Sequence, residues 1–397
     1  MKNIEKTKLI FVNLCDILIE IGFYISILTL LYIKIIPLTY QAIGASISLF
    51  FWLIKSIIQS KASYIHYPWN LTLTILNIWC WLSLIWSVNT QNTVNYSAIF
   101  SAGSLLSIML SSNITKKFQI TRITIFLSVI GTIISIKSIA PALPTYISAL
   151  KSGQFSGEAF LFRKTVLPRI GYTFGEANTL GGFYALLIPY LFSIIFFGSD
   201  ILKSDKTINK IFKFLCKFFG YPIIFLFLIT LMMTSSRGAI LGLIASLLFI
   251  FFVRRNKQTN LILLLIILIL LTLPQIRNFL GYIYAGIVDE SRIIIWLNSL
   301  ELIKIFPFTG VGLGNFKIAY SLYFGEEMMH AHNIYLNTAA ELGLPGFIML
   351  VILSVQIIAF GIIFTKQKED KFYYALNLGL TSMAFGFVIR CLTDFTL

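Results

Sequence analysis

Long runs of apolar residues recur along this chain, and they constrain its fold more than any other feature. A helix needs about 20 predominantly apolar residues to cross the hydrocarbon core of a bilayer, where only helices and closed barrels satisfy their own backbone hydrogen bonds. The sequence therefore predicts an all-α polytopic membrane protein with about 11 or 12 transmembrane helices. The predicted spans are 9–33, 41–59, 69–87, 92–110, 119–139, 177–198, 221–235, 238–253, 259–274, 347–365 and 372–390.

The composition agrees with a single membrane domain over residues 1–397. Hydrophobic residues make up 57% of the chain and charged residues only 12%, which excludes an ordinary soluble domain. The net charge of +15 is carried mostly by short loops between apolar runs, so it does not indicate nucleic-acid binding. The four cysteines are scattered in or beside predicted spans, a spacing that favours neither a zinc site nor a disulfide framework.

Lysine and arginine are concentrated in alternate short loops, such as those around Lys116 and Lys203. The positive-inside rule assigns such loops to the cytoplasm. The N-terminus is then cytoplasmic, and two long segments, 140–176 and 275–346, face the outer side. Segment 140–176 contains Arg169 and is predicted as an outer loop that leads into the span starting near Ala177.

Segment 275–346 is the longest interval without an apolar run of membrane length, and it is the candidate catalytic loop. It contains His330 and His332, two of the three histidines of the chain, together with Arg292 and Trp296. Much of this outer loop is itself predicted to be helical. An Ile- and Leu-rich amphipathic helix is expected over 287–306, where Pro307 ends it.

His332 is the candidate general base. The apolar pattern that follows Asn333 predicts a helix that stops at Gly343, with Pro345 close behind. His332 or Asn333 then lies near the helix N-terminus, where the helix dipole disfavours an imidazolium and keeps the ring neutral. A neutral imidazole at a water-facing edge is suited to accept a proton. The alternative is a histidine that only caps or packs against the helix.

His330 and His332 form an H-x-H pair, with Glu326 and Glu327 nearby. Such a set could hold zinc, but residues two apart on a helix point in different directions, and the other outer segments contain no further histidine. We predict that the site contains no metal and no cofactor.

Arginines on the outer side are candidate anion ligands. Arg292 and Trp296 are four residues apart and share one helix face, where the arginine could bind a diphosphate bidentately and the tryptophan could stack on a sugar. Arg237 lies at the tip of a predicted hairpin between two spans. The structural alternatives are an aromatic–basic interfacial anchor for the first pair and a snorkelling side chain for Arg237.

The glycine cluster GVGLGN, Gly310 to Asn315, superficially resembles a phosphate-binding loop. It follows no predicted strand, so a dinucleotide site is disfavoured. A tight turn in which glycine supplies positive φ explains the cluster better.

Taken together, these motifs resemble the bacterial O-antigen ligase and O-antigen polymerase superfamily. The resemblance covers most of the chain from about 169 onward. Asn178 lies in the run GYTFGEAN, which differs from the family pattern by lacking a proline before the asparagine. The other matching motifs are SRGA at 236–239, R-x-x-x-W followed by PFTGVGLGNF at 292–316, HAHNIYLNTAAELGLPGF at 330–347, and IRCLTDF near the C-terminus.

The resemblance implies a C-type glycosyltransferase fold in the bacterial inner membrane, with its active site on the periplasmic face. It implies a glycan donor linked to undecaprenyl diphosphate, and lipid A core or a growing glycan as the acceptor. His332 then matches the family's base, and Arg237 and Arg292 match its donor-binding arginines, with Arg169 as a third candidate. The candidate supporting residues are Asn333, Trp296, Glu341, Asn178 and His330.

Two alternatives remain open from the sequence. Ligation and polymerisation share the same donor and the same base, and differ in an acceptor pocket that the residues do not reveal. A transporter of an anion or a lipid-linked sugar would also be basic and hydrophobic, but the chain shows no internal repeat of the kind that many transporters are built on.

Overall fold

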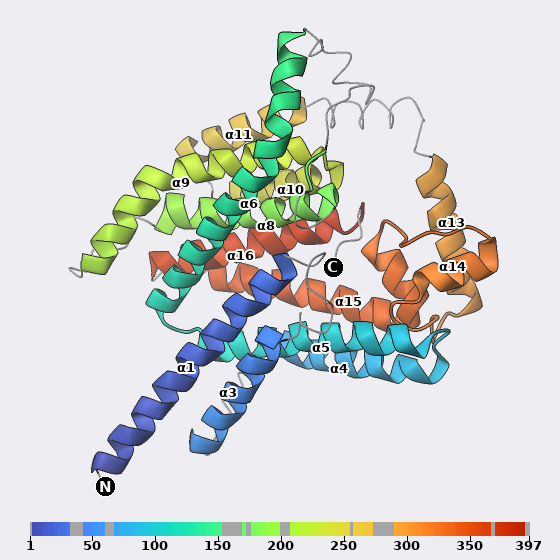
Figure 1. Ribbon diagram of the computed structural model, residues 1–397, viewed down its shortest axis with the longest axis horizontal. Coiled ribbons are helices and arrows are strands. Elements are labelled where there is room, and N and C mark those ends of the chain that lie inside the picture. The colour runs from blue at the N-terminus through green and yellow to red at the C-terminus, as the bar shows by residue number, and fades with distance from the viewer. Residues whose placement is uncertain are drawn as a thin grey trace. The chain divides into compact units, whose positions relative to one another are not determined.

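The computed structural model is built from helices, without a strand among the residues it describes (Figure 1). These residues are 2–31, 43–59, 67–152, 169–171, 176–198, 207–254, 257–272, 290–366 and 370–393. Parts of both predicted outer segments, 153–168, 172–175 and 273–289, lie outside them. The chain divides into two compact units. Unit 1 comprises 1–123, 298–330 and 336–353, and unit 2 comprises 124–297, 331–335 and 354–397.

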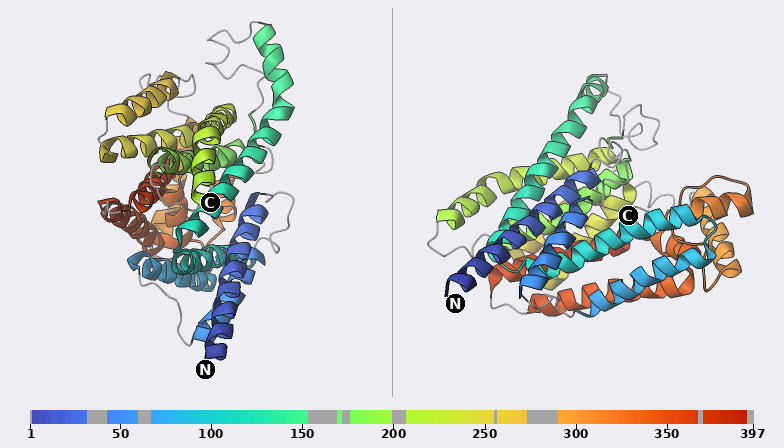
Figure 2. Two further views of the ribbon diagram at one scale, coloured as in Figure 1. Left: turned by 90° about the vertical axis from the view of Figure 1, so that its left-hand side faces the viewer. Right: turned by 60° about the horizontal axis from the view of Figure 1, so that its bottom comes forward.

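Unit 1 is built around four N-terminal helices. They are α1 (Lys2–Leu31), α3 (Ile43–Gln59), α4 (Pro68–Leu82, continued by the 3-10 turn η1, Ser83–Trp86) and α5 (Thr90–Asn113). The helices α4 and α5 lie side by side (Figures 1 and 2). The helices α1 and α3 approach closely at Gly22 and Gly44, where a Cβ on Gly44 would lie 2.4 Å from the carbonyl oxygen of Gly22. Small residues permit this backbone approach, as is common in membrane helix pairs.

Three further helices, α6 (Lys117–Lys151), α13 (Glu290–Ile305) and α15 (Ile334–Lys366), have residues in both units, and α14 (Phe316–Phe324) belongs to unit 1. The helix α13 ends before Pro307, and α15 breaks at Gly343, whose φ is 68°. Both features were predicted from the sequence. The helix α6 continues to Lys151 through Pro141 and Pro144, so the predicted outer loop 140–176 begins as helix.

Unit 2 is organised around α8 (Ala177–Ser193, continued by a π-helical turn η3, Ile194–Gly198). This helix is buried on most of its circumference, and its buried side chains include Leu180, Tyr184, Ile188 and Leu191. A helix that is apolar all round belongs in the interior of a bundle. It packs against α9 (Thr207–Thr234), α10 (Arg237–Arg254) and α16 (Lys371–Arg390), and α11 (Lys257–Thr272) packs against α10.

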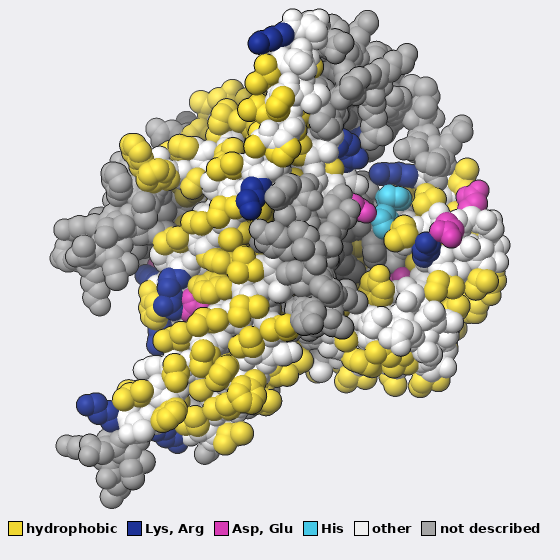
Figure 3. All heavy atoms as spheres, in the orientation of Figure 1, with side chains coloured by type: hydrophobic (Ala, Val, Ile, Leu, Met, Phe, Trp, Pro, Cys, Tyr) yellow, Lys and Arg dark blue, Asp and Glu magenta, His cyan; other side chains and the backbone are white. Residues whose placement is uncertain are grey.

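The helices confirm the predicted class of an all-α, multi-pass membrane protein. Eight helices in the described part of the chain are long and apolar enough to cross a membrane, and three shorter apolar helices accompany them. Each corresponds to one of the segments predicted as spans. Apolar side chains also cover the outward face of α1 (Figure 3), where Leu9, Phe11, Leu14 and Ile17 are exposed. Such exposure is expected of a face that meets lipid rather than water.

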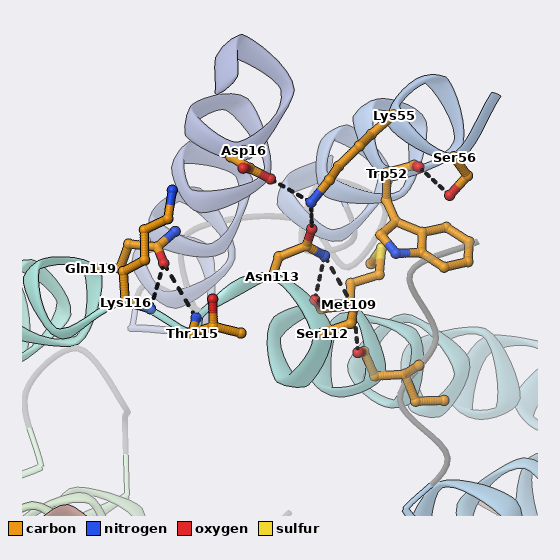
Figure 4. A network of polar contacts seen from close by, with 11 residues as sticks. Asp16, Trp52, Lys55, Ser56, Met109, Ser112, Asn113, Thr115, Lys116 and Gln119 are labelled. Atoms are coloured by element: carbon orange, nitrogen blue, oxygen red, sulfur yellow. Dashed lines mark hydrogen bonds and ion pairs between the residues drawn. The ribbon is translucent and has the colours of Figure 1, made fainter. Parts of the chain in front are cut away.

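The polar residues of α1 are paired inside unit 1. The ammonium group of Lys55 on α3 donates a hydrogen bond to Asp16 on α1 at 2.6 Å and a second to the side-chain oxygen of Asn113 on α5 (Figure 4). Glu20, one turn beyond Asp16, forms an ion pair with Arg122. Charged groups at membrane depth are costly unless they are paired, so these contacts fix how α1, α3 and α5 pack together.

Replacing Lys55 with Met should destabilise the protein strongly, because it leaves the Asp16 carboxylate without its cation. Removing one partner of a buried pair costs about 3 kcal/mol, which should lower the apparent melting temperature in detergent. Lys304→Met is the matched control, because Lys304 forms an exposed ion pair with Glu301 and such pairs contribute at most about 1 kcal/mol. Equal melting temperatures of the two variants would contradict this prediction.

Candidate functional site

His332 lies in unit 2, immediately before the start of α15, as predicted. Its φ is 51°, in the left-handed region, which is sparsely populated by residues other than glycine. The next residue, Asn333, caps the helix, because its side-chain oxygen accepts a hydrogen bond from the Tyr335 amide at 2.9 Å. His332 is half-buried and lies in an unusual backbone turn next to the helix N-terminus.

Three groups from two predicted motifs converge on the turn that follows α16. The Ile334 amide donates to the carbonyl oxygen of Cys391 at 3.0 Å, and the Asn333 side chain donates to that of Leu392 at 3.2 Å. Arg292, from α13, donates to the carbonyl oxygen of Thr393 at 3.1 Å. The structure thus brings Arg292 and the loop of His332 onto one short segment, which we call the 390–393 turn.

Trp296 also contacts this loop. Its indole N–H donates to the carbonyl oxygen of Ala331, the residue before His332, at 3.0 Å. Arg292 and Trp296 are therefore both attached to the surroundings of His332, from the shared helix face that their spacing predicted.

A second group of predicted residues gathers where α8 and α10 begin. The guanidinium of Arg169 donates to the carbonyl oxygen of Thr234 at 2.9 Å and to the side chain of Asn178 at 2.7 Å. Arg237 is the first residue of α10 and is half-buried. Just before it, Ser235 has a φ of 52°, so the loop before Arg237 also contains a non-glycine residue in the left-handed region. Such outliers cost roughly 1–3 kcal/mol each and cluster at functional sites.

Arg390 connects the group of residues around Arg169 with the group around His332. It was not among the site residues predicted from the sequence. This last residue of α16 is only 4% exposed, and its guanidinium donates to the backbone carbonyl oxygen of Asn178 at 2.9 Å. A signal for it was present, because an arginine that ends an apolar span is costly to bury and often has a specific partner.

His330 and Glu341, two of the candidate supporting residues, belong to unit 1. Glu341 is buried, and its carboxylate accepts a hydrogen bond from the Phe316 amide at 3.0 Å, while its carbonyl oxygen accepts one from the Gly312 amide at 2.9 Å. These bonds support the glycine cluster rather than the surroundings of His332.

The glycine cluster is a tight turn, as predicted. Gly310, Gly312 and Gly314 have φ values of 64°, 90° and 78°. A Cβ on Gly310 would lie 2.3 Å from the backbone of Glu341, so the turn also requires glycine for its close approach. Asn315 closes the turn by donating to the hydroxyls of Ser87 and Thr93, each at 2.9 Å.

Glu327, one of the two glutamates near the H-x-H pair, forms an ion pair with Lys317 at 2.8 Å. The neighbouring ammonium lowers the pKa of this exposed carboxyl below its usual range. The residues that the structure describes contain no group of three His, Cys, Asp or Glu side chains that could hold a metal ion.

Comparison with protein families finds a match to the O-antigen ligase family over residues 222–351. The matched region contains Arg237, Arg292, Trp296 and the HAHN segment, and it supports the resemblance over this part of the chain. Arg169, Asn178 and Arg390 lie outside it. The comparison with curated proteins gives no match.

The glycine turn allows a paired test of close approach. Gly325 also has positive φ, at 73°, but a Cβ there would meet no atom within 4 Å. Gly325→Ala should therefore cost only the left-handed strain, about 1–2 kcal/mol. Gly310→Ala should cost about 1–3 kcal/mol more from overpacking. Apparent melting temperatures in detergent measure the difference, and equal losses would show that the approach of Gly310 to Glu341 has no energetic weight.

Proposed function

From the premise that residues 222–351 carry the O-antigen ligase family segment, we propose that this membrane protein is a glycosyltransferase. It moves a glycan from undecaprenyl diphosphate to an acceptor hydroxyl, in one inverting displacement without a metal, at the periplasmic face of the bacterial inner membrane. One observation supports the proposal above others: Arg292 and the loop of His332 are hydrogen-bonded to the same 390–393 turn.

The chemistry needs one base and several cations. The acceptor oxygen forms a bond to the anomeric carbon, while the bond between that carbon and the diphosphate oxygen breaks with its electron pair. The acceptor loses a proton, and the leaving diphosphate gains one negative charge. A neutral imidazole supplies the base, and fixed positive groups stabilise the leaving oxygen without a metal.

His332 is the proposed base for the proton transfer. Its backbone is fixed on both sides, by the bond from Trp296 to Ala331 and by the bonds of Asn333 and Ile334 to the turn. Fixed placement matters because a catalytic base contributes about 100- to 10,000-fold only when its geometry is correct.

The arginines supply the diphosphate site. Arg169 is exposed and oriented by two hydrogen bonds, and Arg237 begins a helix, where amide groups and the dipole also favour anions. Arg292 is held by the carbonyl oxygen of Thr393. Arginine suits this role because its planar fork binds phosphate oxygens bidentately and stays charged.

The acceptor separates two forms of this activity. A ligase transfers the glycan to lipid A core, and a polymerase transfers it to another lipid-linked repeat unit. Deleting the gene and separating the cell's lipopolysaccharide on a gel distinguishes them. Loss of all long glycan on the core indicates a ligase, and a core bearing one repeat unit indicates a polymerase. A wild-type pattern would contradict both.

A transporter is the alternative function. Its test is uptake of the lipid-linked glycan into liposomes that contain the purified protein. Uptake without any glycan transfer would replace the enzyme proposal.

His332→Asn should reduce glycan transfer by at least about 100-fold, because it removes the base. Asparagine tolerates the left-handed conformation better than alanine does, so this variant keeps the backbone turn and isolates the loss of the imidazole. The rate of transfer by the purified protein in detergent is the measurement.

The matched control is His330→Asn, which changes the neighbouring histidine of the same motif and should retain most activity. Wild-type turnover in folded His332→Asn would remove the proposed base.

Arg237→Gln and Arg292→Gln should each weaken donor binding by about 10- to 100-fold, because a hydrogen bond to a charged group contributes roughly 1.5–3 kcal/mol. Lys317→Gln is the control, since this lysine lies in unit 1 and pairs with Glu327. The dissociation constant of the lipid-linked donor in detergent is measured for all three. Unchanged affinity and turnover in both arginine variants would contradict the assignment of Arg237 and Arg292 to donor binding.

A further inference from the structure

The 390–393 turn is attached to both groups of candidate site residues. We infer that it is the positioning element of the site, with Arg390 and Asn333 as positioning residues that hold Arg169 and His332 in fixed relation. The inference rests on the proposed glycosyl transfer and adds residues outside the family match, since Arg390 and the turn lie beyond residue 351.

Arg390 attaches the turn to α8 through a contact that only glycine permits. A Cβ on Gly182 would lie 2.2 Å from one terminal nitrogen of the guanidinium and 2.3 Å from its central carbon. The guanidinium therefore lies against the bare backbone of α8, from which it reaches the carbonyl oxygen of Asn178. Burial of a charged group costs free energy unless its partners are in place, so this position of Arg390 is specific.

The base of the turn is fixed by close helix packing. A Cβ on Gly242 of α10 would lie 2.9 Å from the carbonyl oxygen of Gly386 and 3.0 Å from the Cβ of Arg390. The end of α16 thus packs directly on the backbone of α10, the helix that Arg237 begins. Movement of the turn would require the separation of these helices.

The backbone carbonyl groups of the 390–393 turn bind Arg292 and the loop that carries His332. Carbonyl groups at and beyond a helix end have no partner within the helix. Here those of Cys391, Leu392 and Thr393 accept hydrogen bonds from Ile334, Asn333 and Arg292 in sequence order. A cation such as Arg292 is also favourable near a helix C-terminus. Two of these carbonyls therefore hold the loop that carries His332, and the third holds Arg292.

The attachment of Asn178 completes the connection. Its backbone carbonyl accepts from Arg390, while its side chain accepts from Arg169 at 2.7 Å. One path of hydrogen bonds thus runs from Arg169 through Asn178 and Arg390 to the turn, and from the turn to Asn333 beside His332. Loss of this path should misplace the base relative to the donor-binding arginines, and an error of about 1 Å can cost about 100-fold in rate.

Asn333→Asp tests the path with almost no change in shape. Aspartate caps a helix as well as asparagine does, so the bond from the Tyr335 amide is kept, but the donor to Leu392 is lost. We expect kcat to fall by about 10- to 100-fold, with the KM for donor changed by less than about threefold. The substrates are the lipid-linked glycan and the acceptor glycolipid extracted from a deletion strain, with rates corrected for the folded fraction.

Two changes test the Arg390 end of the path. Gly182→Ala displaces the guanidinium without removing it and should lower kcat in the same way, whereas Gly198→Ala is the control, since a Cβ there would meet its nearest atom at 3.6 Å. Arg390→Lys keeps a charge and one donor, so it should retain more of kcat than Arg390→Leu.

The outcomes separate this inference from the proposed function. Unchanged kcat in folded Asn333→Asp and Gly182→Ala, with inactive His332→Asn, would overturn the positioning role and leave the enzyme assignment intact. Loss of activity that only follows loss of folded protein would also overturn it, because the role would then be structural. Full activity in His332→Asn would remove the proposed function itself.

Discussion

The structure depends on one constraint: a polar group buried among apolar helices must have a partner. Water is not available there to replace a missing hydrogen bond, so each such group determines the position of another segment. The Lys55 ammonium joins three helices of unit 1, and the carbonyl groups after α16 perform the corresponding task in unit 2. Apolar packing brings the helices together, and these few polar contacts select one arrangement among them.

Much of the fold could be predicted because its signals are local. Apolar runs predicted the helices. Pro307 and Gly343 predicted the end of α13 and the break in α15, and the glycine cluster predicted a turn with positive φ. The helix α6 is longer than the predicted span 119–139, because Pro141 and Pro144, in the segment predicted as an outer loop, lie within the helix. A helix can accommodate proline where its surroundings satisfy the freed carbonyl groups.

The contacts that build the candidate site could be predicted less well, because they join residues far apart in sequence. His332 and Arg292 were selected by residue type and spacing, but nothing in those patterns points to the carbonyl groups of residues 391–393. Arg390 was overlooked for the same reason. Glu341 lies in the same motif as His332, and its hydrogen bonds support the glycine turn of unit 1. The motif alone did not indicate these contacts.

The absence of a side chain at Gly182 also has a consequence for sequence variation among related chains. The guanidinium of Arg390 occupies the space that a side chain at position 182 would fill, so the two positions form one volume that can be filled only once. We expect related chains to vary these positions together, with a larger residue at the first accompanying a smaller one at the second. Such paired variation would identify chains that connect α8 to the end of α16 by apolar packing instead of a buried charge.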